Sequence, residues 1–74
     1  MVAIAQALQG VDIAALEARM LLAATLRVSD VHLIAHNEQV LSAAEHERFR
    51  ALVARRAAGE PLAYIMGERE FFSR

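Results

Sequence analysis

Residues 55–72 read RRAAGEPLAYIMGEREFF, and this stretch contains the signals that end one long helix and begin another. Gly59 is placed to end the long helix, because a residue without a Cβ atom readily takes a positive φ just after a helix. Pro61 suits the first turn of the following helix, where its missing N–H has no partner to lose. We predict that the last helix covers Pro61–Met66 and ends at Gly67.

The long helix upstream has an equally clear start. Ser42-Ala43-Ala44-Glu45 is a capping box, in which the Ser hydroxyl accepts from the N3 amide and the Glu carboxylate accepts from the cap amide. The sequence predicts a helix over Ala43–Ala58. Its buried stripe is predicted to consist of Phe49, Leu52, Val53 and Ala57.

Three shorter helical patterns precede it. The first covers Val2–Leu8 and ends at Gly10. The second covers Ile13–Leu26, with Asp12 as its predicted N-cap, and the third covers Asp30–His36 with Ser29 as its cap. The second has an unusually wide apolar face, which predicts a central helix contacted on more than one side. Its stripe is Ile13, Leu16, Met20 and Ala23, widened by Leu21, Leu22 and Leu26.

Composition limits the class of protein. The chain has 74 residues, which is one domain at most, and much of its 57% hydrophobic content is Ala, the best helix former. We therefore predict an all-α fold, a small five-helix bundle over residues 1–67. Residues 68–74 are predicted to form an extended exit segment that begins an interdomain linker, with Phe71-Phe72 as the possible start of a strand.

Charge and cysteine content exclude several functions. Eight Arg and no Lys stand against nine acidic residues, a net charge of −1, which argues against general nucleic-acid binding. There is no Cys to form a disulfide or a thiolate site. The apolar start has no preceding basic residue and is interrupted by Gln6, Gln9 and Asp12, so neither a signal peptide nor a membrane span is expected. A cytoplasmic protein is the simplest interpretation.

Few residues suggest chemistry. His32 and His36 stand at i, i+4 spacing, which can present two imidazoles to a metal, but no third ligand is evident, so solvated histidines are favoured. Glu45 and Glu47 each precede an Arg by three residues and are interpreted as surface ion pairs. The segment contains no glycine-rich nucleotide loop. We predict no catalytic, cofactor-binding or metal-binding residue in it.

Arginines and the helix junction supply the remaining candidates. Arg48 and Arg55 are seven residues apart, hence on one helix face. With Arg50 and Arg56 nearby they could meet an acidic partner surface or a phosphate backbone; the alternative is a solvated, self-neutralised face. Architectural roles at the junction are favoured over catalysis. Glu60 would favour the positive end of the last helix, Tyr64 would turn its ring to the core, and the aromatic pair would cover the domain edge or rest on another domain. The junction candidates are Glu60, Tyr64, Glu70, Phe71 and Phe72.

Written with variable positions, the junction is R-R-x-x-G-E-P-x-A-Y-I-x-G-x-x-E-F. This string resembles the junction of the HemK/PrmC family, methyltransferases that modify the glutamine of a Gly-Gly-Gln loop in peptide chain release factors. The resemblance implies a helical N-terminal domain followed by a Rossmann-like catalytic domain that binds S-adenosylmethionine and carries an Asn-Pro-Pro-Tyr motif. That motif does not occur in residues 1–74, where the only Asn is Asn37. The cofactor is therefore expected to bind beyond residue 74, and this segment alone is expected to be inactive.

The resemblance further implies two partners, the release factor and the protein's own C-terminal catalytic domain. A helical domain that docks the substrate would raise its effective concentration at the catalytic pocket. Two other classes remain open from the residues alone. One is a free-standing helical module that binds protein or RNA through the Arg48/Arg55 face. The other is a small helical enzyme that completes its site by dimerising, as chorismate mutases do, although its arginines stand beside acidic residues.

Overall fold

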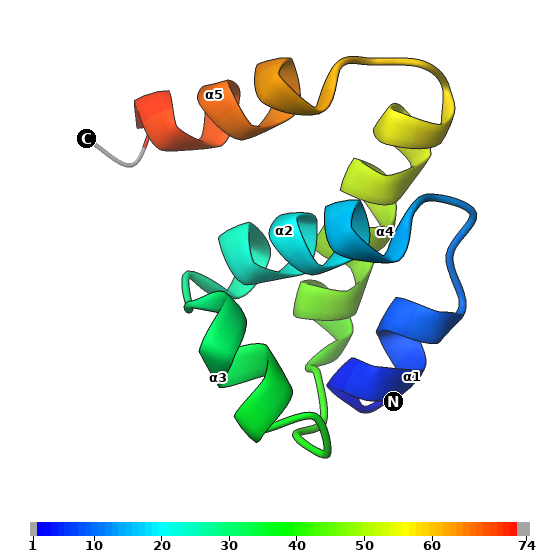
Figure 1. Ribbon diagram of the computed structural model, residues 1–74, viewed down its shortest axis with the longest axis vertical. Helices are drawn as coiled ribbons and strands as arrows, with labels where there is room; N and C mark the ends of the chain where they lie inside the picture. The colour runs from blue at the N-terminus through cyan, green and yellow to red at the C-terminus, as the bar shows by residue number, and fades with distance from the viewer. Residues whose placement is uncertain (1, 73–74) are drawn as a thin grey trace.

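Five helices make up the protein in a computed structural model, which describes the backbone of residues 2–72 and the side chains of residues 2–67 (Figure 1). Within the described residues the only extended pairing is an isolated antiparallel bridge between Ala3 and Val40. The predicted all-α, five-helix bundle is confirmed. The helices are α1 (Ile4–Gln9), α2 (Ala15–Leu26), α3 (Asp30–Ala35), α4 (Ala43–Ala57) and α5 (Leu62–Phe72).

Helix α2 is the centre of the bundle, as its wide apolar face predicts. It contacts each of the other four helices and crosses α4 in the middle of the molecule (Figure 1). The one buried polar side chain among its core residues, Thr25, is satisfied locally because its Oγ1 donates to the Leu21 carbonyl at 2.8 Å. A hydroxyl buried without such a bond would destabilise the fold. The buried face of α2 consists of Ala18, Leu21, Leu22 and Thr25.

The outward face of α2 differs from the prediction. Leu16 is 59% exposed and Met20 39% exposed, although both belong to the predicted core stripe. Ile13 and Ala23, which complete that stripe, are only partly buried. The physical reason is that α2 has apolar residues on two opposite sides, separated by Glu17 and Arg19, so spacing alone could not decide which side the other helices cover. The side they cover is the one opposite Leu16.

The core draws on every helix. Phe49 of α4 is its largest fully buried side chain, and Leu52 is buried one turn further along, as predicted. Val53 is only partly buried, and Ala57 is exposed, contrary to the prediction, because α4 leaves the core near its last turn. The buried apolar residues are Ile4, Ala7, Ala18, Leu21, Leu22, Leu33, Leu41, Phe49, Leu52 and Ile65.

Two of the three predicted helix caps are confirmed. Ser29 accepts a hydrogen bond from the His32 amide at 3.1 Å, and the Ser42–Glu45 capping box forms with both of its bonds, at 2.9 and 3.1 Å. Asp12 does not cap α2, because the chain bends at residues 12–13 and the helix begins at Ala15. This later start leaves Ile13 free to pack against the core.

The first helix also begins later than predicted, at Ile4 rather than Val2. The carbonyl of Val2 instead accepts from the Leu41 amide at 2.9 Å, and the Ile4 amide donates to the Gln39 carbonyl at 2.9 Å. Free amides at a helix start need partners. Here the connector between α3 and α4 supplies two, since the Ala5 amide also donates to the Asn37 carbonyl at 3.0 Å, and the N-terminal segment is thereby attached to the bundle.

The turn between α4 and α5 forms as the junction sequence predicts. Gly59 has φ +104°, in the left-handed region that favours glycine. Its amide donates to the Arg56 carbonyl at 3.1 Å, and the Glu60 amide donates to the Arg55 carbonyl at 3.2 Å. These two bonds make a Schellman motif, which supplies hydrogen-bond donors to carbonyls that have none within the helix.

Helix α5 continues beyond its predicted end. It begins at Leu62, one residue after Pro61, and runs through Gly67 to Phe72. The predicted stop at Gly67, the extended exit segment and the strand at Phe71-Phe72 are therefore wrong for the backbone up to residue 72. A glycine inside a helix costs about 1 kcal/mol relative to Ala but does not end it unless it turns left-handed. The domain boundary at residues 67–68 remains a prediction.

The two glycines should respond oppositely to the same substitution. Gly59→Ala is expected to lower the free energy of unfolding by about 1–2 kcal/mol, since an L-residue at φ +104° is strained. Gly67→Ala is expected to raise it by about 0.5–1 kcal/mol, because a Cβ there meets nothing within 4 Å and Ala favours the helix. Urea denaturation followed by circular dichroism measures both. A destabilising Gly67→Ala would contradict a continuous α5.

Candidate functional site

Arg55 holds the turn between α4 and α5. Its Nε donates to both carboxylate oxygens of Glu60 at 3.2 Å, and its Nη2 donates to Oε1 at 3.0 Å. Both side chains are about one-third exposed. The Glu60 carboxylate therefore points back to α4. The prediction that it would interact with the positive N-terminal end of α5 is wrong.

Arg56 joins three parts of the chain. Its Nε and Nη2 donate to the two carboxylate oxygens of Glu17 in α2, at 3.2 and 3.3 Å. Its Nη1 donates to the Glu60 carbonyl at 3.2 Å. A planar guanidinium suits such a two-point contact with a carboxylate. Together the two arginines hold Glu60 by its side chain and by its carbonyl, and we call this set of four residues the arginine clamp: Glu17, Arg55, Arg56 and Glu60.

The clamp changes the interpretation of the docking candidates. Arg55 and Arg56 have side chains 31% and 30% exposed and are engaged within the molecule. Arg48 is exposed and forms no ion pair with the described residues. The structure therefore brings Arg55 and Arg56 together at the junction. Of the three arginines, Arg48 is the one whose side chain is exposed and available to a partner. Sequence reasoning missed the clamp because Glu17 lies 39 residues from Arg56.

A double-mutant cycle measures the strength of the clamp. Glu17→Gln, Arg56→Gln and the double variant should give a coupling free energy of about 1 kcal/mol, because the pair is bidentate but partly exposed to water. The readout is the free energy of unfolding in urea. Arg48→Gln, which breaks no ion pair among the described residues, is the control and should stay within about 0.5 kcal/mol of the unmodified chain. A coupling near zero would mean that the clamp does not hold in solution.

The junction candidates occupy different environments. Tyr64 is 62% exposed, so the expectation that its ring turns to the core is wrong. The neighbouring Ile65 is buried and supplies the core contact of α5 instead. Glu70, Phe71 and Phe72 belong to the helical backbone of α5, and their side chains lie outside the described part of the structure.

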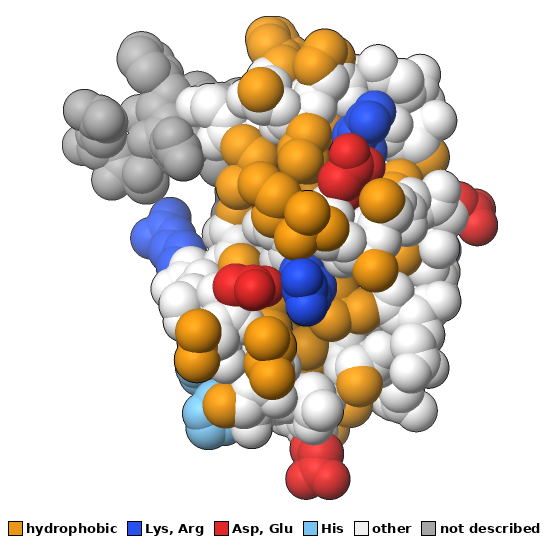
Figure 2. Space-filling view, in the orientation of Figure 1, with side chains coloured by type: hydrophobic (Ala, Val, Ile, Leu, Met, Phe, Trp, Pro, Cys, Tyr) orange, Lys and Arg blue, Asp and Glu red, His pale blue; other side chains and the backbone are white. Residues whose placement is uncertain are grey.

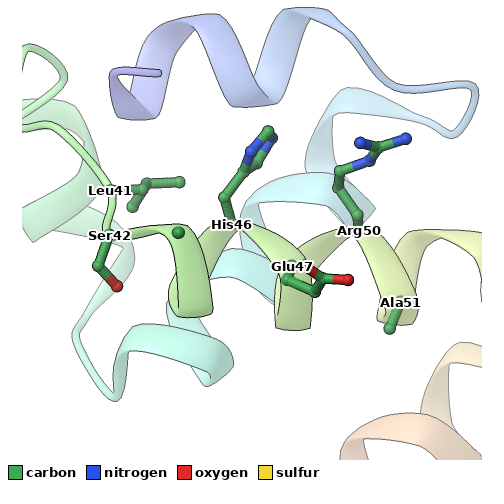
Figure 3. Close-up of a pocket in the computed structure, with 7 residues that line it drawn as sticks. Leu41, Ser42, His46, Glu47, Arg50 and Ala51 are labelled. Carbon is green, nitrogen blue, oxygen red and sulfur yellow. The ribbon is translucent and has the colours of Figure 1, made fainter. Parts of the chain in front are cut away.

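An open hollow beside the first half of α4 was not anticipated from the sequence. Figure 3 shows His46 and Arg50 extending from the same side of the helix. An imidazole and a guanidinium on successive turns can contact an anionic group, although Glu47 also lines the hollow. All its lining residues come from one stretch of chain, 41–51, so the hollow is one-sided. They are Leu41, Ser42, Ala43, His46, Glu47, Arg50 and Ala51.

The two closely spaced histidines contact each other. The ring centroids of His32 and His36 are 4.3 Å apart, and His32 Nε2 lies 3.3 Å from Gln39 Oε1. Across the described residues, no three His, Cys, Asp or Glu side chains gather closely enough to hold a metal ion. No helix in the same part of the chain has the length and apolar character needed to cross a membrane.

The exposed apolar stripe of α2 is the other notable surface. Figure 2 shows hydrophobic side chains gathered over this helix, between two pairs of oppositely charged side chains. Glu17 and Arg19 flank Leu16 and Met20 on opposite sides, since successive helical residues are about 100° apart. Glu17 pairs with Arg56, and the Arg19 Nε lies 3.6 Å from an Asp30 carboxylate oxygen. The charges on the two long sides of the stripe are thus paired within the molecule.

Known proteins resemble the chain over most of its length. It is 48% identical over 68 residues to a release factor glutamine methyltransferase of Burkholderia pseudomallei, and these residues cover 92% of the chain. It is 42% identical over 86% of the chain to a protein of the same name from Nitratidesulfovibrio vulgaris, and 45% identical over 88% to a bifunctional methyltransferase of Rickettsia prowazekii. The chain spans only 24%, 22% and 12% of the lengths of these relatives, respectively.

No solved structure gives a significant match. A family model that describes the PrmC N-terminal domain matches residues 3–67, which covers α1 to α4, the clamp and the first half of α5. The predicted resemblance is therefore confirmed, and the chain belongs to the family of the PrmC N-terminal domain.

Proposed function

We propose that this chain is the substrate-docking and scaffold domain of an S-adenosylmethionine-dependent methyltransferase that modifies the side-chain amide of the glutamine in the Gly-Gly-Gln motif of peptide chain release factors. The observation that carries the proposal is the family match over residues 3–67, together with relatives named for this activity. The proposal places the protein in the cytoplasm with its substrate. It also assigns the chemistry to a domain beyond residue 74.

The described residues do not fit the cofactor. The hollow beside α4 is open and is lined by the single stretch 41–51, which offers no enclosed cavity for an adenosine. The sequence also has no glycine-rich loop next to a helix start. We therefore assign no catalytic step to any residue of this chain.

A scaffold role is supported by the arginine clamp. Helix α5 carries the chain away from the bundle, and its direction depends on the turn at Gly59 and Glu60. Arg55 and Arg56 fix that turn to α4 and, through Glu17, to α2. A domain attached after α5 would then keep a defined position relative to the bundle.

A docking role is assigned to the exposed face that carries Arg48. Arg48→Glu in the full-length protein is expected to raise KM for intact release factor about 3- to 10-fold, because a reversed charge at the rim of an interface weakens association. The kcat value and the KM for a short Gly-Gly-Gln peptide should not change. The assay follows transfer of a labelled methyl group to each substrate, and a release factor with Gln→Ala at the target position should take up no label.

Arg50→Glu is the matched control, since it makes the same charge change on the side of α4 that faces the hollow (Figure 3). Its KM for intact release factor should stay within about 2-fold of the unmodified enzyme. Equal effects of the two variants would overturn the assignment of the docking face to Arg48. Label on a residue other than the target glutamine would overturn the proposed reaction.

A further inference from the structure

Helix α2 has two apolar sides and only one is covered. Its inner side is buried by the other four helices, whereas Leu16 and Met20, one turn apart on the outer side, are 59% and 39% exposed. An apolar stripe on a helix is usually the side that packs against another part of a protein. Single exposed apolar side chains need no explanation, but this pair is continuous with the half-buried Ile13 and Ala23.

The charge around the stripe restricts what could cover it. Glu17 and Arg19 flank it, and each is paired within the molecule, with Arg56 and with Asp30. The charged side chains on the two long sides of the stripe are therefore paired, while Asp12 and Arg27 lie at its two ends. An apolar centre inside a neutral polar rim is the arrangement found in protein–protein interfaces. It suits an apolar protein surface and does not suit nucleic acid or a strongly acidic segment.

The area of the stripe indicates whether its partner is a separate protein or a domain of the same chain. A stable complex between separate proteins buries about 800 Å² on each side. That is about a sixth of the 4929 Å² surface of this molecule, far more than a stripe of four side chains can supply. A tethered domain needs a smaller contact, because most of the entropy of association is already lost.

The position of the stripe matches that requirement. Helix α5 contacts α2 and runs beside it in roughly the same direction, so the chain leaves the bundle on the α2 side of the molecule, beyond the C-terminal end of that helix (Figure 1). About three-quarters of the length of the release factor glutamine methyltransferase relatives lies outside the part matched by this chain. A domain that follows α5 would be held close to Leu16 and Met20.

We propose that the outer stripe of α2, formed by Ile13, Leu16, Met20 and Ala23, is an interdomain contact that is covered by the catalytic domain following residue 74. The inference rests on the proposed function, since it requires that domain to exist. It adds that the helical domain packs on the catalytic domain through α2, leaving the Arg48 face for the release factor.

Thiol labelling of the full-length protein tests the contact. Leu16→Cys places a reactive group on the stripe, and Val31→Cys is the matched control on α3, where Val31 is 72% exposed. Residues 1–74 contain no other Cys, and peptide mass spectrometry separates these sites from any later in the chain. Rates in the native protein are divided by rates in denaturant to remove intrinsic reactivity. Met20→Cys repeats the measurement one turn along.

A covered stripe predicts labelling at positions 16 and 20 at least about 10-fold slower than at position 31, independent of protein concentration and of added release factor. Rates within about 2-fold of one another would overturn the contact. Protection that disappears on dilution would assign the stripe to a second copy instead, and protection that appears only with release factor would assign it to the substrate; both results overturn the proposal. The methylation assay is separate, so protection without methylation would retain the contact while the proposed reaction fails.

Discussion

Phe49→Ala is expected to lower the free energy of unfolding of the 74-residue chain by about 3–5 kcal/mol. Phe49 is the largest of the fully buried side chains and lies in α4, which packs on α2 at the centre of the bundle. Removing a buried Phe ring costs about 3–5 kcal/mol, from lost transfer energy and the cavity that remains. A domain of this size is stabilised by only about 4–11 kcal/mol in total. One substitution therefore removes much or all of the stability.

Urea denaturation followed by circular dichroism at 222 nm would measure the loss. Phe49→Leu is the matched control: it keeps most of the apolar volume, so the expected cost is about 1–1.5 kcal/mol. Val31→Ala, at an exposed position of α3, should stay within about 0.5 kcal/mol of the unmodified chain. A loss below about 1 kcal/mol for Phe49→Ala would mean that Phe49 is not at the centre of the core.

Local signals predicted most of the fold. Ser29, the Ser42–Glu45 box and Gly59 act on backbone groups within three or four residues, and each does so in the structure. The number of helices and their order follow from such signals. Asp12 is not a cap because capping depends on where the helix begins, and this helix begins at Ala15, after the bend at residues 12–13.

Long-range choices were not predictable from spacing. The helix at residues 15–26 has apolar residues on two opposite sides, and only the approach of four other helices decides that Leu21 is buried while Leu16 is not. The end of α5 is a similar case. Gly67 is compatible with both a helix end and a helix interior, and nothing nearby forces it left-handed.

The candidate site was predicted in part. The family that the junction string resembles is confirmed, whereas the roles expected for Glu60 and Tyr64 are not what the structure shows. The roles of its arginines were not predicted, because Arg56 reaches Glu17 across the bundle and Arg55 reaches Glu60 across the turn. Such pairings depend on the folded arrangement of α2 and α4, so a single sequence gave no sign of them. Arg48 kept its predicted exposure since its face of α4 points away from the core.

Removing the helical domain should lower kcat/KM much more for intact release factor than for a short peptide. Deleting residues 1–67 from the full-length protein is expected to lower kcat/KM for intact release factor about 100-fold, because the docking contact no longer raises the effective concentration of the loop at the catalytic pocket. For a short Gly-Gly-Gln peptide, which is too small to span both domains, the loss should stay below about 3-fold. Unchanged binding of S-adenosylmethionine, measured by calorimetry, would show that the remaining domain is folded.

The most direct test of the account is therefore the ratio of the two kcat/KM values, intact release factor over peptide, measured before and after this deletion in the same preparation. Substrate docking by the helical domain predicts that the ratio falls at least about 30-fold. An unchanged ratio, with equal losses on both substrates, would contradict docking and leave the five-helix bundle with a purely structural role.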